Sequence, residues 1–142
     1  MKYLCSRHRA ALAAQPWEAL SCWEGAMRNG QHAIKENRHS YARAFFGCAW
    51  ELALMHVHPG CKVNAYFAVN HLVDAGDKLC RVLVAIGCQH ETECLLRLMR
   101  DYVLLGAGDS ALDVSRREQL LTLYNVVDEL TQLCSSGHAT QH

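Results

Sequence analysis

The sequence predicts an all-α protein of about six helices, with one helical domain over residues 1–135 and a frayed tail over residues 136–142. Alanine and leucine dominate its apolar residues, and both favour helices over strands. Apolar residues also recur at spacings of three and four through most of the chain, which is the period of an amphipathic helix. Half of the 142 residues are hydrophobic and a fifth are charged, as in compact domains with a single core.

The first two helices are predicted on either side of Pro16. The first covers residues 3–14, and Pro16 suits the first turn of the second helix, where its missing N–H costs nothing. On the second helix an apolar stripe faces a polar one. Glu24 and Arg28 lie four residues apart on the polar stripe, so we expect them to form an ion pair.

The third helix is predicted to be the central one. The polar residues 36–39 end the second helix, and Ser40 is the expected cap of a third helix that runs to about Val57. Arg43 and Glu51 are its only charged residues, so it is apolar nearly all round. We therefore expect it to pack against neighbours on two sides.

A Pro-Gly pair at residues 59–60 marks the clearest loop of the chain. The fourth helix is predicted over residues 62–86, because its polar stripe continues in phase through Gly76. A glycine inside a helix costs about 1 kcal/mol relative to alanine, so a break at Gly76 is the alternative. Gly87 is the expected end of this helix.

Two further helices complete the prediction. The fifth runs over residues 89–105 and is followed by a turn at residues 106–109. Ser110 and Asp113 then resemble a capping box that uses the shorter acid. The last helix extends to about Cys134, with one apolar and one polar face, as expected of a helix that covers one side of a core.

The charge of the chain is balanced but unevenly spread. Residues 1–43 carry seven Lys and Arg residues against three acidic ones, and the remainder carries seven against eleven. This asymmetry favours an acidic partner or self-association, and it is too small to indicate nucleic-acid binding. No uncharged run approaches the 18 residues of a membrane span, so no membrane partner is predicted.

The cysteines indicate a reducing compartment. Most of them fall among apolar residues inside periodic segments, where we expect reduced core residues rather than disulfides. No signal peptide is apparent near the start of the chain, and a bacterial-type cytoplasm or an equivalent compartment is the predicted location. The eight cysteines are Cys5, Cys22, Cys48, Cys61, Cys80, Cys88, Cys94 and Cys134.

Small and aromatic residues in the second and third helices carry a family resemblance. Gly30 is followed twelve residues later by Ala42, and Phe46 and Ala49 follow four and seven positions after that. At this spacing the segment resembles a tetratricopeptide (TPR) repeat, a helical hairpin used in protein-binding scaffolds. The resemblance implies a right-handed array of antiparallel hairpins, in which small residues let the paired helices approach closely. Four other positions depart from the family pattern, and a compact helical bundle is the alternative; the departures are Ala26, Asn29, Ala33 and Leu54.

The resemblance also implies where a partner would bind. In such arrays the first helix of each hairpin lines the concave side, which points to the polar stripes of the second and fourth helices. The alternative is that these stripes are simply the solvated faces of the protein. The candidate partner-binding residues are Arg28, Gln31, Lys35, Asn70, His71, Asp74 and Lys78.

Two groups of histidine and cysteine suggest a zinc site as an alternative. One surrounds the Pro-Gly loop and the other follows Gly87, so soft and borderline ligands gather near two turns. Neither group has the paired Cys-x2-Cys spacing of a zinc module. The residues are His56, His58 and Cys61 in the first group, and Cys88, His90 and Cys94 in the second.

No catalytic signature is present. The pair His71 and Asp74 lies three residues apart on a predicted helix surface, which is the spacing of an ordinary neighbour contact. The sequence therefore predicts a non-enzymatic protein- or peptide-binding module without a cofactor. A metal- or thiol-dependent sensor and a homodimeric helical bundle are the alternatives.

Overall fold

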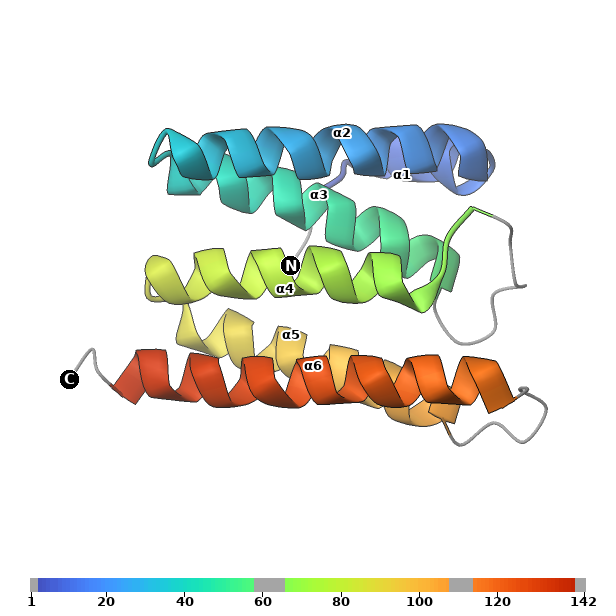
Figure 1. Cartoon of the computed structure of the whole chain (residues 1–142). Coiled ribbons are helices and arrows are strands. Elements are labelled where there is room, and N and C mark those ends of the chain that lie inside the picture. The colour runs from blue at the N-terminus through green and yellow to red at the C-terminus, as the bar shows by residue number, and fades with distance from the viewer. Residues whose placement is uncertain (1–2, 58–65, 108–113, 140–142) are drawn as a thin grey trace.

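The protein is all-helical, as its sequence predicts. A computed structural model describes residues 3–57, 66–107 and 114–139, and these contain six α-helices and no strand (Figure 1). None of the helices within these ranges is both long and apolar enough to cross a membrane. The helices are α1 (Ser6–Ala13), α2 (Pro16–Lys35), α3 (His39–Val57), α4 (Val69–Ala85), α5 (Gln89–Ala107) and α6 (Val114–Ala139).

The helices form two layers. Helices α2, α4 and α6 run side by side in the same direction, and α3 and α5 lie behind them in the opposite direction (Figure 1). Each of α3, α4 and α5 packs against the helix before it and the helix after it, and α4 also contacts α6. The short α1 lies against α2 and α3. The fold is thus built from antiparallel helix pairs placed one after another.

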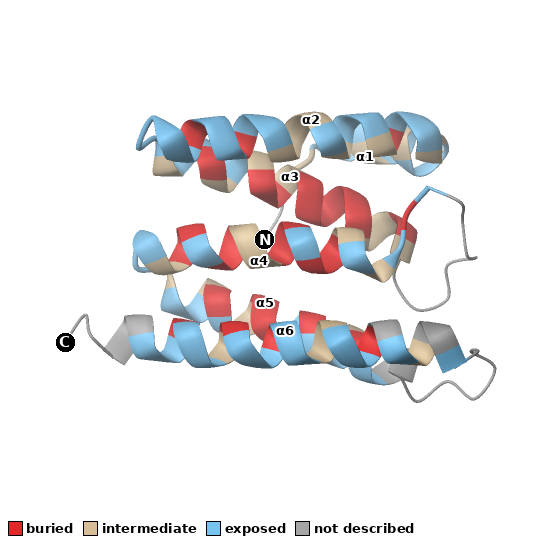
Figure 2. Cartoon of the chain, viewed as in Figure 1, coloured by how far each residue is buried: buried red, intermediate tan, exposed pale blue. Residues whose placement is uncertain are grey.

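Helix α3 is the centre of the fold, as its sequence predicts. It packs against both α2 and α4, and its buried residues cover most of its circumference (Figure 2). At the contact with α2, the ring of Phe46 lies directly over Gly30. A Cβ atom at Gly30 would come within 2.5 Å of Cε1 of Phe46, so the close approach of α2 and α3 requires a glycine there.

Helix α4 continues through Gly76 without a break. Gly76 lies where α3, α4 and α5 meet, and the space beside it is filled by the side chains of Met99 and Trp50. A Cβ atom at this position would be 3.1 Å from Cζ3 of Trp50 and closer still to Sδ of Met99. The packing of these two large side chains compensates the intrinsic cost of about 1 kcal/mol for a glycine inside a helix.

The turns between α2 and α3 and between α4 and α5 have the same geometry. In each, one residue adopts a positive φ, Asn37 at 57° and Gly87 at 78°. The next N–H group then donates to a carbonyl five residues back, from Arg38 to Ala33 and from Cys88 to Leu83, both at 2.8 Å. This is the Schellman motif, so both helix pairs are closed by the same backbone device.

Helix α4 begins later than its sequence predicts. It starts at Val69, whereas residues 66–68 are not helical and residues 62–65 lie outside the described part of the chain. Ala68 is extended, and its N–H donates to Nδ1 of His71 at 3.0 Å. The N–H of His71 in turn donates to the Ala68 carbonyl, so His71 closes the start of the helix.

Other helix boundaries also differ from expectation. Helix α1 begins at Ser6 rather than residue 3, because residues 3–5 are not helical and the N–H groups of Tyr3 and Leu4 bind Glu51 of α3. Helix α5 continues to Ala107, so residues 106–107 of the expected turn are helical. Helix α6 continues past Cys134 to Ala139, well into the segment expected to be frayed. The expected capping box at Ser110 and Asp113 lies outside the described residues.

Candidate functional site

The partner-binding residues predicted on α2 lie on its surface. Arg28, Gln31 and Lys35 are all exposed. The expected ion pair between Glu24 and Arg28 is absent, and neither Arg28 nor Lys35 forms an ion pair with any residue that the structure describes. Because Arg28 and Lys35 are seven residues apart, their side chains lie two turns apart on one face of α2. That face therefore presents two cations without acidic neighbours bound to them.

The residues predicted on α4 divide into two kinds. Asn70 and Asp74 are exposed and Lys78 is half-buried, so these three can be reached from solvent. His71 is half-buried and its ring is engaged within the fold. Its ring stands edge-on to Trp23 of α2, with 4.8 Å between the ring centroids, and its Nδ1 accepts the Ala68 N–H. His71 thus contacts α2 from the start of α4.

His56, from the first predicted zinc group, is also engaged within the fold. Its Nε2 donates to the carbonyl of Leu12 at 3.2 Å, and its ring stacks on Phe67 with 4.9 Å between centroids. Burial lowers the pKa of His56, since a charged imidazole is poorly solvated there, and the bond to Leu12 opposes part of this shift. Its predicted companions His58 and Cys61 lie outside the described residues.

The side chains of the second predicted zinc group do not converge on one point. Sγ of Cys94 lies 3.7 Å from Nε2 of His90, one helical turn away on α5. Sγ of Cys88 is turned away from them, toward Nη1 of Arg43 on α3 at 4.0 Å. Over the ranges that the structure describes, no three His, Cys, Asp or Glu side chains are grouped to hold a metal ion.

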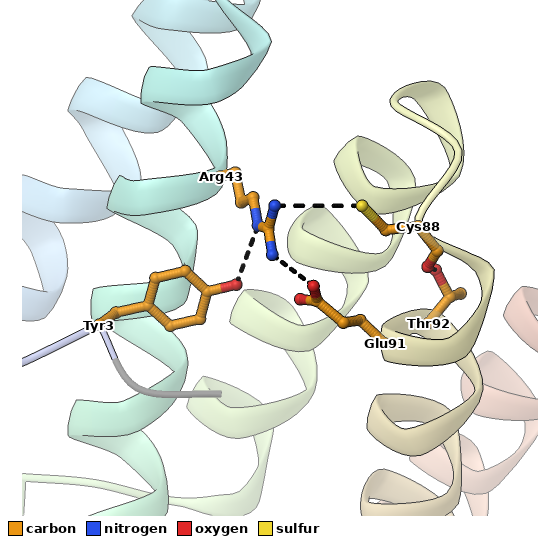
Figure 3. A network of polar contacts seen from close by, with 5 residues as sticks. All are labelled: Tyr3, Arg43, Cys88, Glu91 and Thr92. Atoms are coloured by element: carbon orange, nitrogen blue, oxygen red, sulfur yellow. Dashed lines mark hydrogen bonds and ion pairs between the residues drawn. The ribbon is translucent and has the colours of Figure 1, made fainter.

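A polar network that the sequence analysis did not predict joins the amino-terminal segment to α3 and α5 (Figure 3). Nε of Arg43 donates to the hydroxyl of Tyr3 at 3.3 Å, and the same guanidinium forms an ion pair with Glu91 of α5. Thr92, fully buried beside Glu91, donates to the Cys88 carbonyl at 2.8 Å. Burial raises the pKa of the Tyr3 hydroxyl, and the bond from Arg43 opposes part of this rise.

Glu51 holds the same amino-terminal segment from α3. Its carboxylate is 3 % exposed, and it accepts the backbone N–H groups of Tyr3 and Leu4, each at 2.7 Å. It also pairs with Arg9 at 3.2 Å. We call residues 3–9 the strap. The strap site consists of Arg43, Gly47, Cys48 and Glu51 of α3, which contact the strap, and of Glu91 of α5, which pairs with Arg43.

One sequence signal pointed to the strap site. Arg43 and Glu51 are the two charged residues of an otherwise apolar helix, and a buried charge needs a partner. Their partners could not be named from the sequence, because Tyr3 and Glu91 are each at least 40 residues away along the chain.

Two buried thiols meet between α4 and α6. Cys80 and Cys134 are hydrogen-bonded to each other, and this bond together with burial raises the pKa of Cys80 far above its ordinary range. A thiol in this state is protonated and unreactive at neutral pH. The seven cysteines within the described part of the chain are all free, but only these two are buried; Cys5 and Cys22 are exposed.

Comparison of the chain with known protein families, with characterised proteins and with solved structures finds no match. Its described residues form a two-layered all-α fold of antiparallel helix pairs.

Proposed function

We propose that this protein is a non-enzymatic binding module, whose layer of α2 and α4 binds an acidic segment of a partner protein. The observation that carries the proposal is the pair Arg28 and Lys35, two exposed cations on one face of α2 with no bound acidic residue in the described structure. Solvated cations of this kind are available to a partner's carboxylates without first breaking an internal ion pair.

The repeated hairpin geometry also supports this proposal. The same turn closes α2–α3 and α4–α5, and the resemblance of the first pair to a TPR hairpin implies a partner on the first helix of each pair. Asn70, Asp74 and Lys78 of α4 would then border the surface, and Gln31 would lie within it. His71 would position α4 against α2. The free state of the described cysteines favours a reducing compartment such as the cytoplasm for this activity.

Charge reversal tests the proposed surface. We expect the double variant Arg28→Glu with Lys35→Glu to lose a partner that the unchanged protein retains in a pull-down from native lysate, because the variant repels acidic groups. Raising the salt concentration should weaken the same partner's binding to the unchanged protein, since exposed charges are screened.

A second double variant serves as the matched control. Arg97 and Arg100 of α5 are exposed and form no ion pair with a described residue, so Arg97→Glu with Arg100→Glu changes the net charge equally on another helix. It should retain the partner, and both variants should melt at the temperature of the parent. Recovery of the same proteins by all three forms would contradict the proposed surface.

A further inference from the structure

We propose that the strap site is a second peptide-binding site, which the strap occupies within the same chain and which a tyrosine-bearing segment of a partner protein occupies in exchange. The site belongs to α3 and α5 and shares no residue with the surface proposed on α2 and α4. The strap itself supplies the argument, because it shows what chemistry the site accepts.

The first feature of the site recognises backbone. Glu51 accepts two successive N–H groups at 2.7 Å, a contact that depends on a bend in the chain at Leu4 and not on its side chains. With the strap in place this carboxylate is almost completely buried, so a segment that replaces the strap must supply N–H donors in the same positions. Sγ of Cys48 adds a weak bond to the Tyr3 carbonyl at 3.6 Å.

The second feature recognises a phenol. The Tyr3 ring lies on Gly47, and a Cβ atom at Gly47 would overlap three of its ring carbons. The hydroxyl beyond the ring accepts a hydrogen bond from Arg43, which Glu91 holds in place (Figure 3). A tyrosine therefore fills the space over Gly47 and binds Arg43, whereas a phenylalanine would leave Arg43 without that bond.

The strap leaves one group of the site unused. Oε1 of Glu91 pairs with Arg43, but Oε2 is buried and has no hydrogen-bond partner among the described residues. An incoming segment with a Lys, an Arg or another donor beside its tyrosine can fill this acceptor and so bind more favourably than the strap. Helix α1 buries none of its residues completely, whereas Tyr3 and Leu4 of the strap pack against the core. Release of the strap therefore uncovers apolar surface at these two residues, and an incoming tyrosine covers it again at the position of Tyr3.

The strap is covalently connected to its site, and this connection decides which protein variant can bind a free peptide measurably. A segment tethered within its own chain competes at an effective concentration of about millimolar, so a free peptide binds weakly while the strap is intact. Replacing Tyr3 removes the ring and hydroxyl contacts of the competitor while leaving the site unchanged. Peptide binding should then become measurable in the full-length chain.

The experiment uses a fluorescently labelled peptide with the sequence of residues 1–9 and fluorescence anisotropy under reducing conditions. We expect the full-length Tyr3→Ala variant to bind it at least roughly tenfold more tightly than the unchanged protein, because the tethered competitor is weakened. Adding Gly47→Ala to Tyr3→Ala should abolish binding, since the new methyl group takes the place of the ring. A peptide in which the tyrosine is alanine should not bind any form, and this control does not depend on the stability of a protein variant.

Three results would overturn the proposal: equal binding by the unchanged protein and Tyr3→Ala, equal binding of the two peptides, or undiminished binding when Gly47→Ala is present. Sedimentation of the unchanged protein tests whether the strap of a second copy of the chain can occupy the site. If the protein forms a concentration-dependent dimer that Tyr3→Ala abolishes, the segment that occupies the site in exchange is the strap of another copy and not a segment of a partner protein. The charge-reversal variant of α2 should bind the peptide as its parent does, so failure of either site leaves the other testable.

Discussion

Gly30 and Gly25 lie in the same helix, and their surroundings predict opposite effects of alanine. At Gly30 a methyl group would meet the buried ring of Phe46 at 2.5 Å, so Gly30→Ala should destabilise the protein by about 1–3 kcal/mol. At Gly25 the nearest side-chain atom is 3.9 Å away, on Arg28, so no overlap arises. Gly25→Ala should stabilise the protein by up to about 1 kcal/mol, because alanine is the better helix former.

Urea denaturation of the two alanine variants measures both effects on one scale. A similar change in the free energy of unfolding for both would contradict the packing described at Gly30.

The buried ring of His56 should make stability depend on pH. The pKa of His56 is lowered from 6.5 by burial, so below about pH 6.5 the unfolded chain binds a proton that the folded protein binds less readily. The contribution of His56 to the free energy of unfolding is therefore complete above this pH and is lost as the pH falls. Urea midpoints of the unchanged protein should decrease on acidification, and those of His56→Gln should decrease less. An equally steep decrease in both proteins would exclude His56 as the cause.

Residues differ in how far their roles could be predicted from the sequence. The close approach of α2 and α3 at Gly30 follows from the spacing of small residues within one hairpin, but the ring of Phe46 over Gly30 was not predicted. The role of His71 could not be predicted, because its polar stripe suggested solvent whereas its ring closes the start of α4 and contacts Trp23. Likewise Glu51 depends on Tyr3, which is 48 residues earlier in the chain.

Among the elements, α6 offers a direct comparison of a buried and an exposed leucine. Leu130 is 2 % exposed on the face toward the core, and Leu133, three residues on, is 51 % exposed. Leu130→Ala should destabilise the protein by about 2–5 kcal/mol through the cavity it leaves. Leu133→Ala should change the free energy of unfolding by less than about 0.5 kcal/mol. Comparable losses in urea denaturation would mean that the outer face of α6 is covered in solution.

The two Schellman turns show which helix ends can be predicted and which cannot. Gly87 was expected to end α4, because glycine adopts a positive φ without strain. Asn37 does the same at the end of α2 and was recognised only as part of a polar segment. The prediction was wrong at the start of α4, where His71 binds the N–H of Ala68, and at residues 3–5, where the contact with Glu51 overrides local helix preference.

At the scale of the whole molecule, the predicted central position of α3 is confirmed. A helix with only two charged residues must cover nearly all of its surface, and packing between α2 and α4 does so. The contact of α4 with α6 could not be predicted, since an apolar stripe shows which face is covered and not which helix covers it. For the same reason the sequence offered a repeat array and a bundle as alternatives.

The contact of Trp23 on α2 with His71 on α4 gives the protein an optical signal of its own. Trp17 is 54 % exposed and Trp50 is 2 % exposed, while Trp23 is half-buried against the imidazole of His71. Indole emission shifts to longer wavelength in water and is quenched by a neighbouring imidazole. Separation of α2 from α4 should therefore brighten Trp23 while the blue emission of Trp50 persists, and loss of the core should shift Trp50 as well. Intrinsic fluorescence can thus distinguish opening of the first layer from unfolding of the centre without any added label.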